Sequence, residues 1–142
     1  KKKYNTPKTK ILPFSFIIAS TNINMLRKKQ SDIKFSDDDI LIKVFENINK
    51  YYKKSMIKNI TILLHPSEKV DKYSHLNFRE EKYDVIKIND PLNLLSKYSH
   101  IIGFESMLLV IGKLVNLKTI NIDMGLPRLR AIPKKFIDIK WN

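Results

Sequence analysis

Short apolar segments alternate along the chain with segments of helical periodicity, and this alternation restricts the fold more than any other feature. The apolar segments have the composition of buried strands and occupy residues 11–20, 60–64, 83–88, 99–103 and 118–122. Strands that alternate with helices form a parallel sheet with helices on both faces. Because crossover connections are right-handed, the sequence predicts an α/β fold with an open, Rossmann-like sheet of about five strands in the order 3-2-1-4-5.

Three of the intervening segments are predicted to be helices. Ser36 precedes three aspartates, which suits the cap and first turn of a helix, and an apolar stripe continues to about residue 54. Asp90 and Pro91 predict the cap and first residue of a second helix that ends near residue 98. A third helix, expected to be buried because it is almost wholly apolar, runs from Ser106 to about residue 112. Residues 22–35 are predicted to form a loop, and residues 67–82 to form a short helix or a loop.

The chain is strongly basic, with 27 Lys and Arg residues against 14 Asp and Glu and a net charge of +13. Lys, Ile and Asn, which A/T-only codons encode, make up 56 of the 142 residues, so much of the charge is attributed to codon composition and a solvated surface. Lysine is spread over the predicted helices, the loops and the C-terminal tail, and no RNA-binding motif is present. The absence of cysteine excludes disulfides, thiolate metal sites and a cysteine nucleophile, and it fits a reducing, cytoplasmic setting.

The length allows one domain. We expect residues 1–10 to be a flexible lead-in or linker, residues 11–125 to form the domain, and residues 126–142 to pack back onto it through Trp141. No apolar stretch reaches the ~20 residues that a membrane-spanning helix needs. The chain begins with Lys1, so we expect it to be a fragment of a longer protein.

The ligand of an open α/β sheet lies outside the carboxyl ends of the strands, where the strand order reverses. In the predicted order this point lies between the first and fourth strands. The residues that leave the carboxyl ends are therefore the candidates for function: Ser20, Thr21 and Asn22, His65 and Pro66, Asn89 and Asp90, residues 103–106, and residues 123–125.

The turn between the fourth strand and the third helix has the features of a phosphate site. Ser106 opens the helix, and the backbone N–H groups of Met107 and Leu108 are expected to point, unpaired, toward the ligand. The alternative is that Ser106 only caps its own helix.

His65 leaves the second strand and precedes a proline, which keeps its backbone out of the helical region and fixes its side-chain direction. An imidazole held in this way can donate a hydrogen bond to a phosphate and stabilise charge as a sugar departs. The alternative is a strand that simply stops at a proline after a histidine. We expect His65 and Ser106 to lie in the same cleft, and together they favour phosphate binding there.

The other polar residues are expected to serve structure. His75 and His100 have no partner pattern, and the aspartates at 37–39 suit helix capping better than a metal site. Carboxylates in loops rarely perform acid–base chemistry, which applies to Glu68, Asp71 and Glu105. With three glycines and no GxGxxG, P-loop or HExxH motif, the chain is not expected to bind dinucleotides or triphosphates in the usual ways.

Two segments resemble a known family. ITILLHPSE (residues 60–68) and SHIIGFESMLLVIGKLVNLKTINI (residues 99–122) are similar to the donor-binding, C-terminal half of GT-B glycosyltransferases, particularly bacterial sialyltransferases and polysialyltransferases. In that family a His-Pro motif after a strand and a serine that opens a later helix hold the phosphate of a CMP-sugar. The resemblance therefore implies a donor-binding site made by His65, Pro66, Gly103, Glu105 and Ser106, with Ser20, Thr21, Asn89 and Asp90 lining the nucleotide cleft.

The implied reaction is inverting transfer of sialic acid from CMP-sialic acid to a glycan acceptor of the capsule or lipooligosaccharide type, without a metal or other cofactor. His65 is then the catalytic residue, which offsets charge on the departing CMP. The family's acidic general base, a carboxylate pair followed by glycine, has no counterpart here, so it is assigned to an N-terminal domain outside this chain. The implied location is the cytoplasm, at the inner face of the bacterial membrane.

Two alternatives remain open from the residues. A GT-B relative with a UDP-sugar or CDP-polyol donor, or a UDP-sugar epimerase, would use the same fold and serine turn. A basic nucleic-acid-binding module would use the net charge instead, and it requires lysines and aromatic residues gathered on one face.

Overall fold

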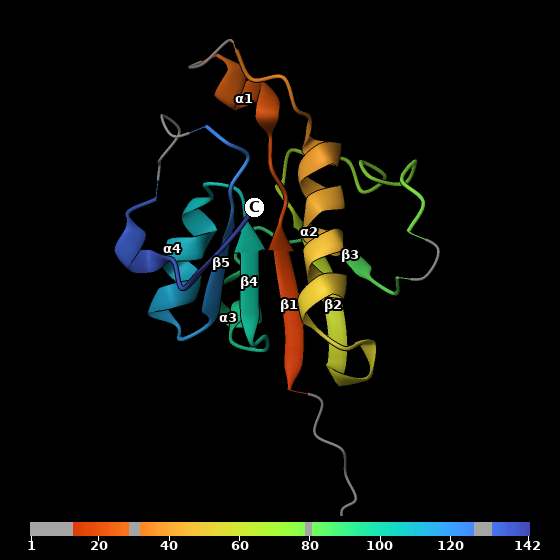
Figure 1. Ribbon diagram of the computed structural model, residues 1–142, viewed down its shortest axis with the longest axis vertical. Coiled ribbons are helices and arrows are strands. Elements are labelled where there is room, and N and C mark those ends of the chain that lie inside the picture. Colours follow the sequence, from red (N-terminus) through yellow and green to blue (C-terminus); the bar gives the residue numbers. More distant parts are fainter. Residues whose placement is uncertain (1–12, 29–31, 79–80, 127–131) are drawn as a thin grey trace, which may run out of the picture.

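The protein is built on one parallel sheet. The computed structural model describes residues 13–28, 32–78, 81–126 and 132–142. In these ranges the strand order is β3-β2-β1-β4-β5-β6, and every neighbouring pair is parallel (Figure 1). The α/β fold and the order of the first five strands are as predicted. The strands are β1 (Phe14–Ala19), β2 (Ile57–Leu64), β3 (Asp84–Lys87), β4 (His100–Gly103), β5 (Lys118–Ile122) and β6 (Ile139–Trp141).

The sixth strand was not predicted. β6 pairs with β5, with Ile139 opposite Ile120, and the Asp123 N–H donates to the Trp141 carbonyl at 2.7 Å. Trp141 is buried, and its ring stacks on Tyr51 with centroids 5.9 Å apart. A strand of three residues with an exposed lysine in its middle leaves too short a pattern to be found in the sequence.

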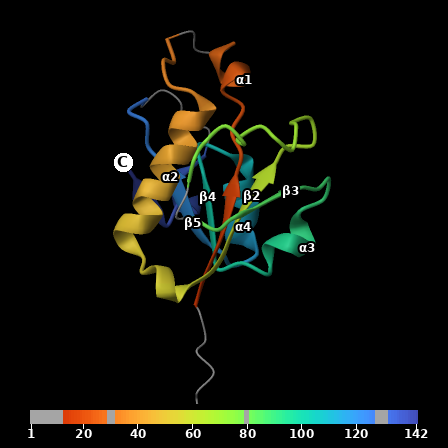
Figure 2. The same ribbon diagram turned by 90° about the vertical axis from the view of Figure 1, so that its right-hand side faces the viewer.

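Helices cover both faces of the sheet, as predicted. α2 (Asp37–Tyr51) lies across one face, and α3 (Leu92–Leu95) and α4 (Met107–Leu114) lie against the other (Figure 2). Alternate residues of β1 divide the core, because Phe16 and Ile18 pack with the α2 side and Ile17 packs with Leu109 of α4. Two 3-10 turns, η2 (Lys54–Met56) and η3 (Lys134–Phe136), complete the described elements.

The start of α2 confirms the predicted cap. The Ser36 hydroxyl accepts the Asp39 N–H at 3.2 Å, and the Asp39 carboxylate accepts the Ser36 N–H at 2.8 Å. This reciprocal capping box satisfies two backbone donors and places negative charge at the positive end of the helix dipole.

Three helical segments differ from prediction. Part of residues 22–35, predicted to be a loop, forms the short helix α1 (Ile23–Arg27), which Asn22 caps. The helix predicted to run from Asp90 to about residue 98 is shortened to α3, with Pro91 at its N-cap position, because the chain after Leu95 continues in tight turns toward Tyr98. α4 was predicted to be buried, yet Met107 and Leu114 are exposed, since only the side facing β4 and β5 is covered.

Two glycines let α4 lie close to the sheet. A Cβ on Gly112 would approach the Ile101 Cγ2 to 2.6 Å, and a Cβ on Gly103 would approach the Ser106 Cβ to 3.2 Å. Because neither glycine has a side chain, the start of α4, and Ser106 with it, can lie close to the ends of β1 and β4.

His100 is expected to make the fold acid-sensitive. It is buried beside Phe14, Phe16 and Tyr52, and burial, helped by the charge of Lys118, holds its pKa below the ordinary value. A depressed histidine pKa means that the unfolded chain binds the proton more readily, so stability falls as the pH drops below about 6.5.

Replacing this residue, in the variant His100→Phe, is expected to flatten the fall in unfolding free energy from about pH 6.5 to pH 5. The wild type should lose more unfolding free energy than the variant over this pH range, by about 1.4 kcal/mol for each unit by which folding lowers the His100 pKa. Urea unfolding over this pH range measures it. An equal pH slope in both proteins would remove His100 as the cause.

Candidate functional site

The strand order reverses at β1, which pairs with β2 on one side and β4 on the other. The segments that leave these three strands therefore lie next to one another at the carboxyl edge of the sheet. They begin at Ser20 after β1, at His65 after β2, and at Phe104 after β4. This is where an open α/β sheet binds its ligand.

Ser106 caps α4, so it has the structural role that the sequence offered as the alternative to phosphate binding. Its hydroxyl accepts the Leu108 N–H at 3.2 Å. The prediction that this N–H is unpaired was therefore wrong: the serine side chain folds back and satisfies it. A hydroxyl that accepts this bond keeps its own hydrogen for donation, so Ser106 can cap the helix and donate to an anion.

Glu105 faces β5 rather than β2. Its N–H donates to the Asn121 Oδ1 at 2.9 Å, and its carboxylate accepts hydrogen bonds from the Asn121 side-chain amide and, at 3.3 Å, from the Ile132 N–H. Its φ of 47° lies in the left-handed region, which a non-glycine residue adopts at a cost. The pairing with Asn121 stabilises this backbone and so fixes the turn before Ser106.

A pocket opens beside this turn. Its volume is about 420 Å³, and it lies between the end of β5, β6 and residues 132–138. The described lining combines apolar side chains such as Phe104 and Met124 with charged ones, among them Glu105, Lys134 and Lys140. Such a volume is within the range of small-molecule sites.

His65 begins a tight turn that holds both its backbone and its ring. The Glu68 N–H donates to the His65 carbonyl at 2.9 Å, and the His65 N–H donates to the Glu68 Oε1 at 2.7 Å. The imidazole Nδ1 contacts Ser67, with the backbone N at 3.2 Å and the hydroxyl Oγ at 2.7 Å. The ring itself is exposed, as is Pro66, so the imidazole is oriented and accessible.

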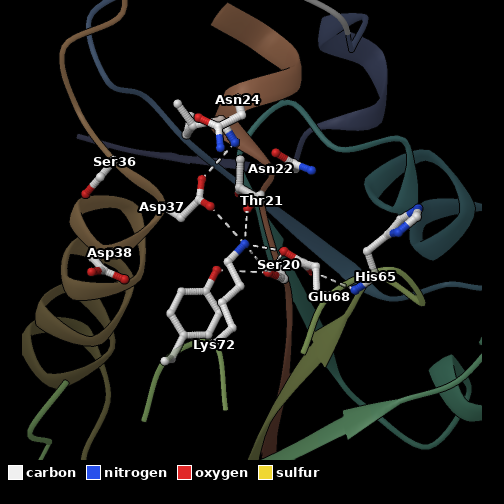
Figure 3. A network of polar contacts seen from close by, with 12 residues as sticks. Ser20, Thr21, Asn22, Asn24, Ser36, Asp37, Asp38, His65, Glu68 and Lys72 are labelled. Carbon is white, nitrogen blue, oxygen red and sulfur yellow. Dashed lines mark hydrogen bonds and ion pairs between the residues drawn. The ribbon is translucent and has the colours of Figure 1, made fainter. Parts of the chain in front are cut away.

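Beneath this turn lies a network of charges that the sequence interpretation missed. The Lys72 ammonium is paired with the carboxylates of Glu68 and, at 2.8 Å, Asp37 (Figure 3). It also donates to the Thr21 carbonyl at 2.7 Å. The Ser20 hydroxyl contacts the Glu68 Oε2 at 3.2 Å. Lys72 thus joins the ends of β1 and β2 to the start of α2.

The surroundings of Lys72 stabilise its charge. Burial lowers the pKa of Lys72, but the hydrogen bonds that its ammonium donates to Asp37 and Glu68 outweigh burial and leave the pKa well above its ordinary value. Burial also raises the pKa of the neighbouring Tyr73, whose hydroxyl lies 2.8 Å from the Ser20 Oγ. At neutral pH the network therefore consists of the Lys72 ammonium between two carboxylates, with the neutral hydroxyls of Ser20 and Tyr73 beside it.

The structure brings together only part of the predicted site. Ser20, Thr21 and His65 are joined through Glu68 and Lys72, and Ser106 follows the adjacent strand. Asn89 and Asp90 are exposed beyond β3, which is separated from β1 by β2. The Asp90 carboxylate accepts the Leu92 N–H at 3.2 Å, so among the described contacts it serves α3.

One signal for the missed residues is present in the sequence. Glu68 and Lys72 are four residues apart, the spacing at which opposite charges meet on a helical turn. The partners of Lys72 in other segments, Asp37 and Thr21, have no such signal because only the fold brings them near. Within the described ranges no group of three or more metal-ligating side chains gathers, and no helix there is long and apolar enough to cross a membrane.

Comparison with known proteins bears on the fold. No family model matches the sequence, and no curated protein matches it. Among solved structures, KpsC from Thermosulfurimonas dismutans, a beta Kdo 2,4 transferase, superposes with a TM-score of 0.56 at 15% sequence identity. The chain has a glycosyltransferase-like fold. The match covers 84% of this chain and 37% of KpsC, so the chain spans little more than a third of the length of that transferase.

Proposed function

We propose that this chain is the donor-binding domain of a glycosyltransferase whose donor is a CMP-linked acidic sugar. One observation carries the proposal: an oriented, accessible imidazole and a helix-capping serine leave the two strands that flank β1. Both side chains can donate hydrogen bonds to a phosphate at the switch point. The pocket of about 420 Å³ beside Glu105 offers room for another part of the donor.

The proposed reaction is inverting. An acceptor hydroxyl attacks the anomeric carbon, the bond between that carbon and the phosphate oxygen breaks, and CMP leaves with the electron pair. His65 donates a hydrogen bond to the phosphate as its charge grows, and Ser106 anchors it. The acceptor hydroxyl loses its proton to a base on a further, acceptor-binding domain, and no metal is required for these steps. The acceptor is a bacterial surface glycan, and the reaction takes place at the inner face of the membrane.

Sialic acid is the proposed sugar, and the likeness to KpsC favours Kdo as a second candidate. Both are acidic keto sugars, so both add a carboxylate to the donor. The net charge of +13 attracts an anionic donor of either kind.

Calorimetric titration with CMP, UDP and a short oligonucleotide tests the proposal. We expect CMP to bind, and the variant Ser106→Ala to raise its Kd about tenfold, because a hydrogen bond to a charged group is lost. The matched control is Ser36→Ala, which removes the cap of α2 in the same way and leaves the proposed phosphate site intact.

The other outcomes separate the alternatives. Preference for UDP would keep the fold and change the donor. Binding of the oligonucleotide alone would favour the basic nucleic-acid-binding module. If neither nucleotide binds, Ser106 is a helix cap and the proposed function fails.

A further inference from the structure

The turn at residues 65–68 restrains His65 at two levels. The first is the backbone, where the His65 N–H and carbonyl both bond to Glu68, at 2.7 Å and 2.9 Å. Glu68 is only 9% exposed, and its other carboxylate oxygen is held by Lys72 and by Ser20 at 3.2 Å. The acceptor for the His65 N–H is therefore itself held in place by Ser20, which follows β1, and by Lys72, which follows the turn.

The second level is the imidazole. The Ser67 backbone N lies 3.2 Å from the His65 Nδ1, and its Oγ lies 2.7 Å from the same atom. A backbone N–H can only donate, so Nδ1 must be the acceptor and carries no proton in the neutral ring. The proton then resides on Nε2, for which the described residues provide no hydrogen-bond partner. In Figure 3 the ring points away from the ion network.

We propose that Ser67 and Glu68 are positioning residues that hold His65 as the Nε2–H tautomer and present that N–H to the donor phosphate. The tautomer follows from the contacts alone, whereas the phosphate rests on the proposed function. With Nδ1 already occupied, the ring offers a donor outward, which is the polarity that an anionic leaving group needs. A ring turned the other way would present a lone pair and repel it.

Nitrogen NMR of the imidazole rings tests the tautomer directly. The protein contains three histidines, and comparison with the variant His65→Gln identifies the His65 signals. At about pH 8.5, where imidazoles are neutral, we expect the His65 Nδ1 at the position of an unprotonated acceptor and Nε2 at that of a protonated nitrogen. The variant Ser67→Ala should move both signals toward averaged values, and Ser67→Thr, which keeps a hydroxyl, should restore them.

Titration of the wild type, Ser67→Ala and Ser67→Thr with CMP tests the consequence. We expect Ser67→Ala to raise the Kd about three- to tenfold and Ser67→Thr to match the wild type. Because Ser67 is exposed, Ser67→Ala is expected to fold normally, which a change of the buried Glu68 would not ensure.

Averaged nitrogen signals in the wild type would overturn the tautomer. Identical signals in wild type and Ser67→Ala would overturn the positioning role of the Ser67 hydroxyl, because the Ser67 backbone N–H, which both proteins keep, would then hold the ring alone. The failure of the proposed function gives a different result. In that case the nitrogen signals behave as expected and support the tautomer assignment, but CMP binds to none of the proteins. The proposal that the His65 Nε2–H faces a phosphate is then overturned.

Discussion

Under the proposed function, replacing His65 with alanine is expected to slow the release of CMP from CMP-sialic acid about 10²- to 10³-fold, the usual cost of one lost donor to a developing oxyanion. The imidazole is exposed and its only described side-chain contact is with Ser67, so the fold should be unaffected. CMP release from the full-length protein is the suitable measurement because water can take the sugar, and no acceptor has to be identified.

The kinetic constants separate the proposed role from simple binding. If His65 stabilises charge that appears only as the bond breaks, kcat should fall more than KM rises. The matched control is His75→Ala, which removes an exposed histidine that is paired with Asp38 at 2.5 Å and that no described hydrogen bond joins to His65 or Ser106. Spontaneous release is subtracted with a protein-free sample. Equal turnover in His65→Ala and the control would take His65 out of the mechanism.

Much of the sheet was predictable because its central strands carry continuous apolar runs. Residues such as Ile17 in β1 and Ile101 in β4 are fully buried, and a short run rich in Ile is typical of a strand covered on both faces. The start of α2 was predictable for a local reason, since Ser36 and Asp39 have capping-box spacing. Short elements were not, because α1, α3 and β6 have too few residues to show a period.

The apolar composition of α4 also misled the prediction of its burial. Hydrophobic residues indicate what can be covered, but not what lies over them, and Met107 and Leu114 are exposed in this structure.

The candidate site was predictable only in part, for a similar reason. His65 and Ser106 stand at strand ends and can be found from the chain itself. Lys72 and Thr21 are 51 residues apart in sequence, and only the packing of β1 beside β2 brings the ammonium to that carbonyl. Glu68 was assigned to a loop without chemistry, yet its buried carboxylate organises the turn that orients His65.

Lys72 is expected to contribute more to stability than any other charged side chain near the site. The variant Lys72→Met should lower the unfolding free energy by about 3 kcal/mol, because Glu68 and Asp37 would be left without their shared counter-ion. This is the lower end of the range for breaking a buried ion pair, since the lysine side chain is 19% exposed. Urea unfolding at neutral pH is the measurement.

The pH of that measurement follows from the direction of the pKa. Because the folded protein holds the Lys72 pKa above its ordinary value, the stabilisation is fully present below the unfolded value of about 10.5 and is lost only as the pH rises through the folded one. Neutral pH therefore reports the whole contribution.

Two further variants identify the cause of the loss. Lys69→Met removes an exposed lysine from the same turn and should change stability by less than about 0.5 kcal/mol. Adding Glu68→Gln to Lys72→Met removes one of the stranded carboxylates, so the double variant should lose less than the sum of the two single changes. A Lys72→Met protein as stable as Lys69→Met would show that hydration, rather than Lys72, stabilises the two carboxylates. The turn that carries His65 would then depend on the hydrogen bonds that Glu68 forms with His65 and Ser20.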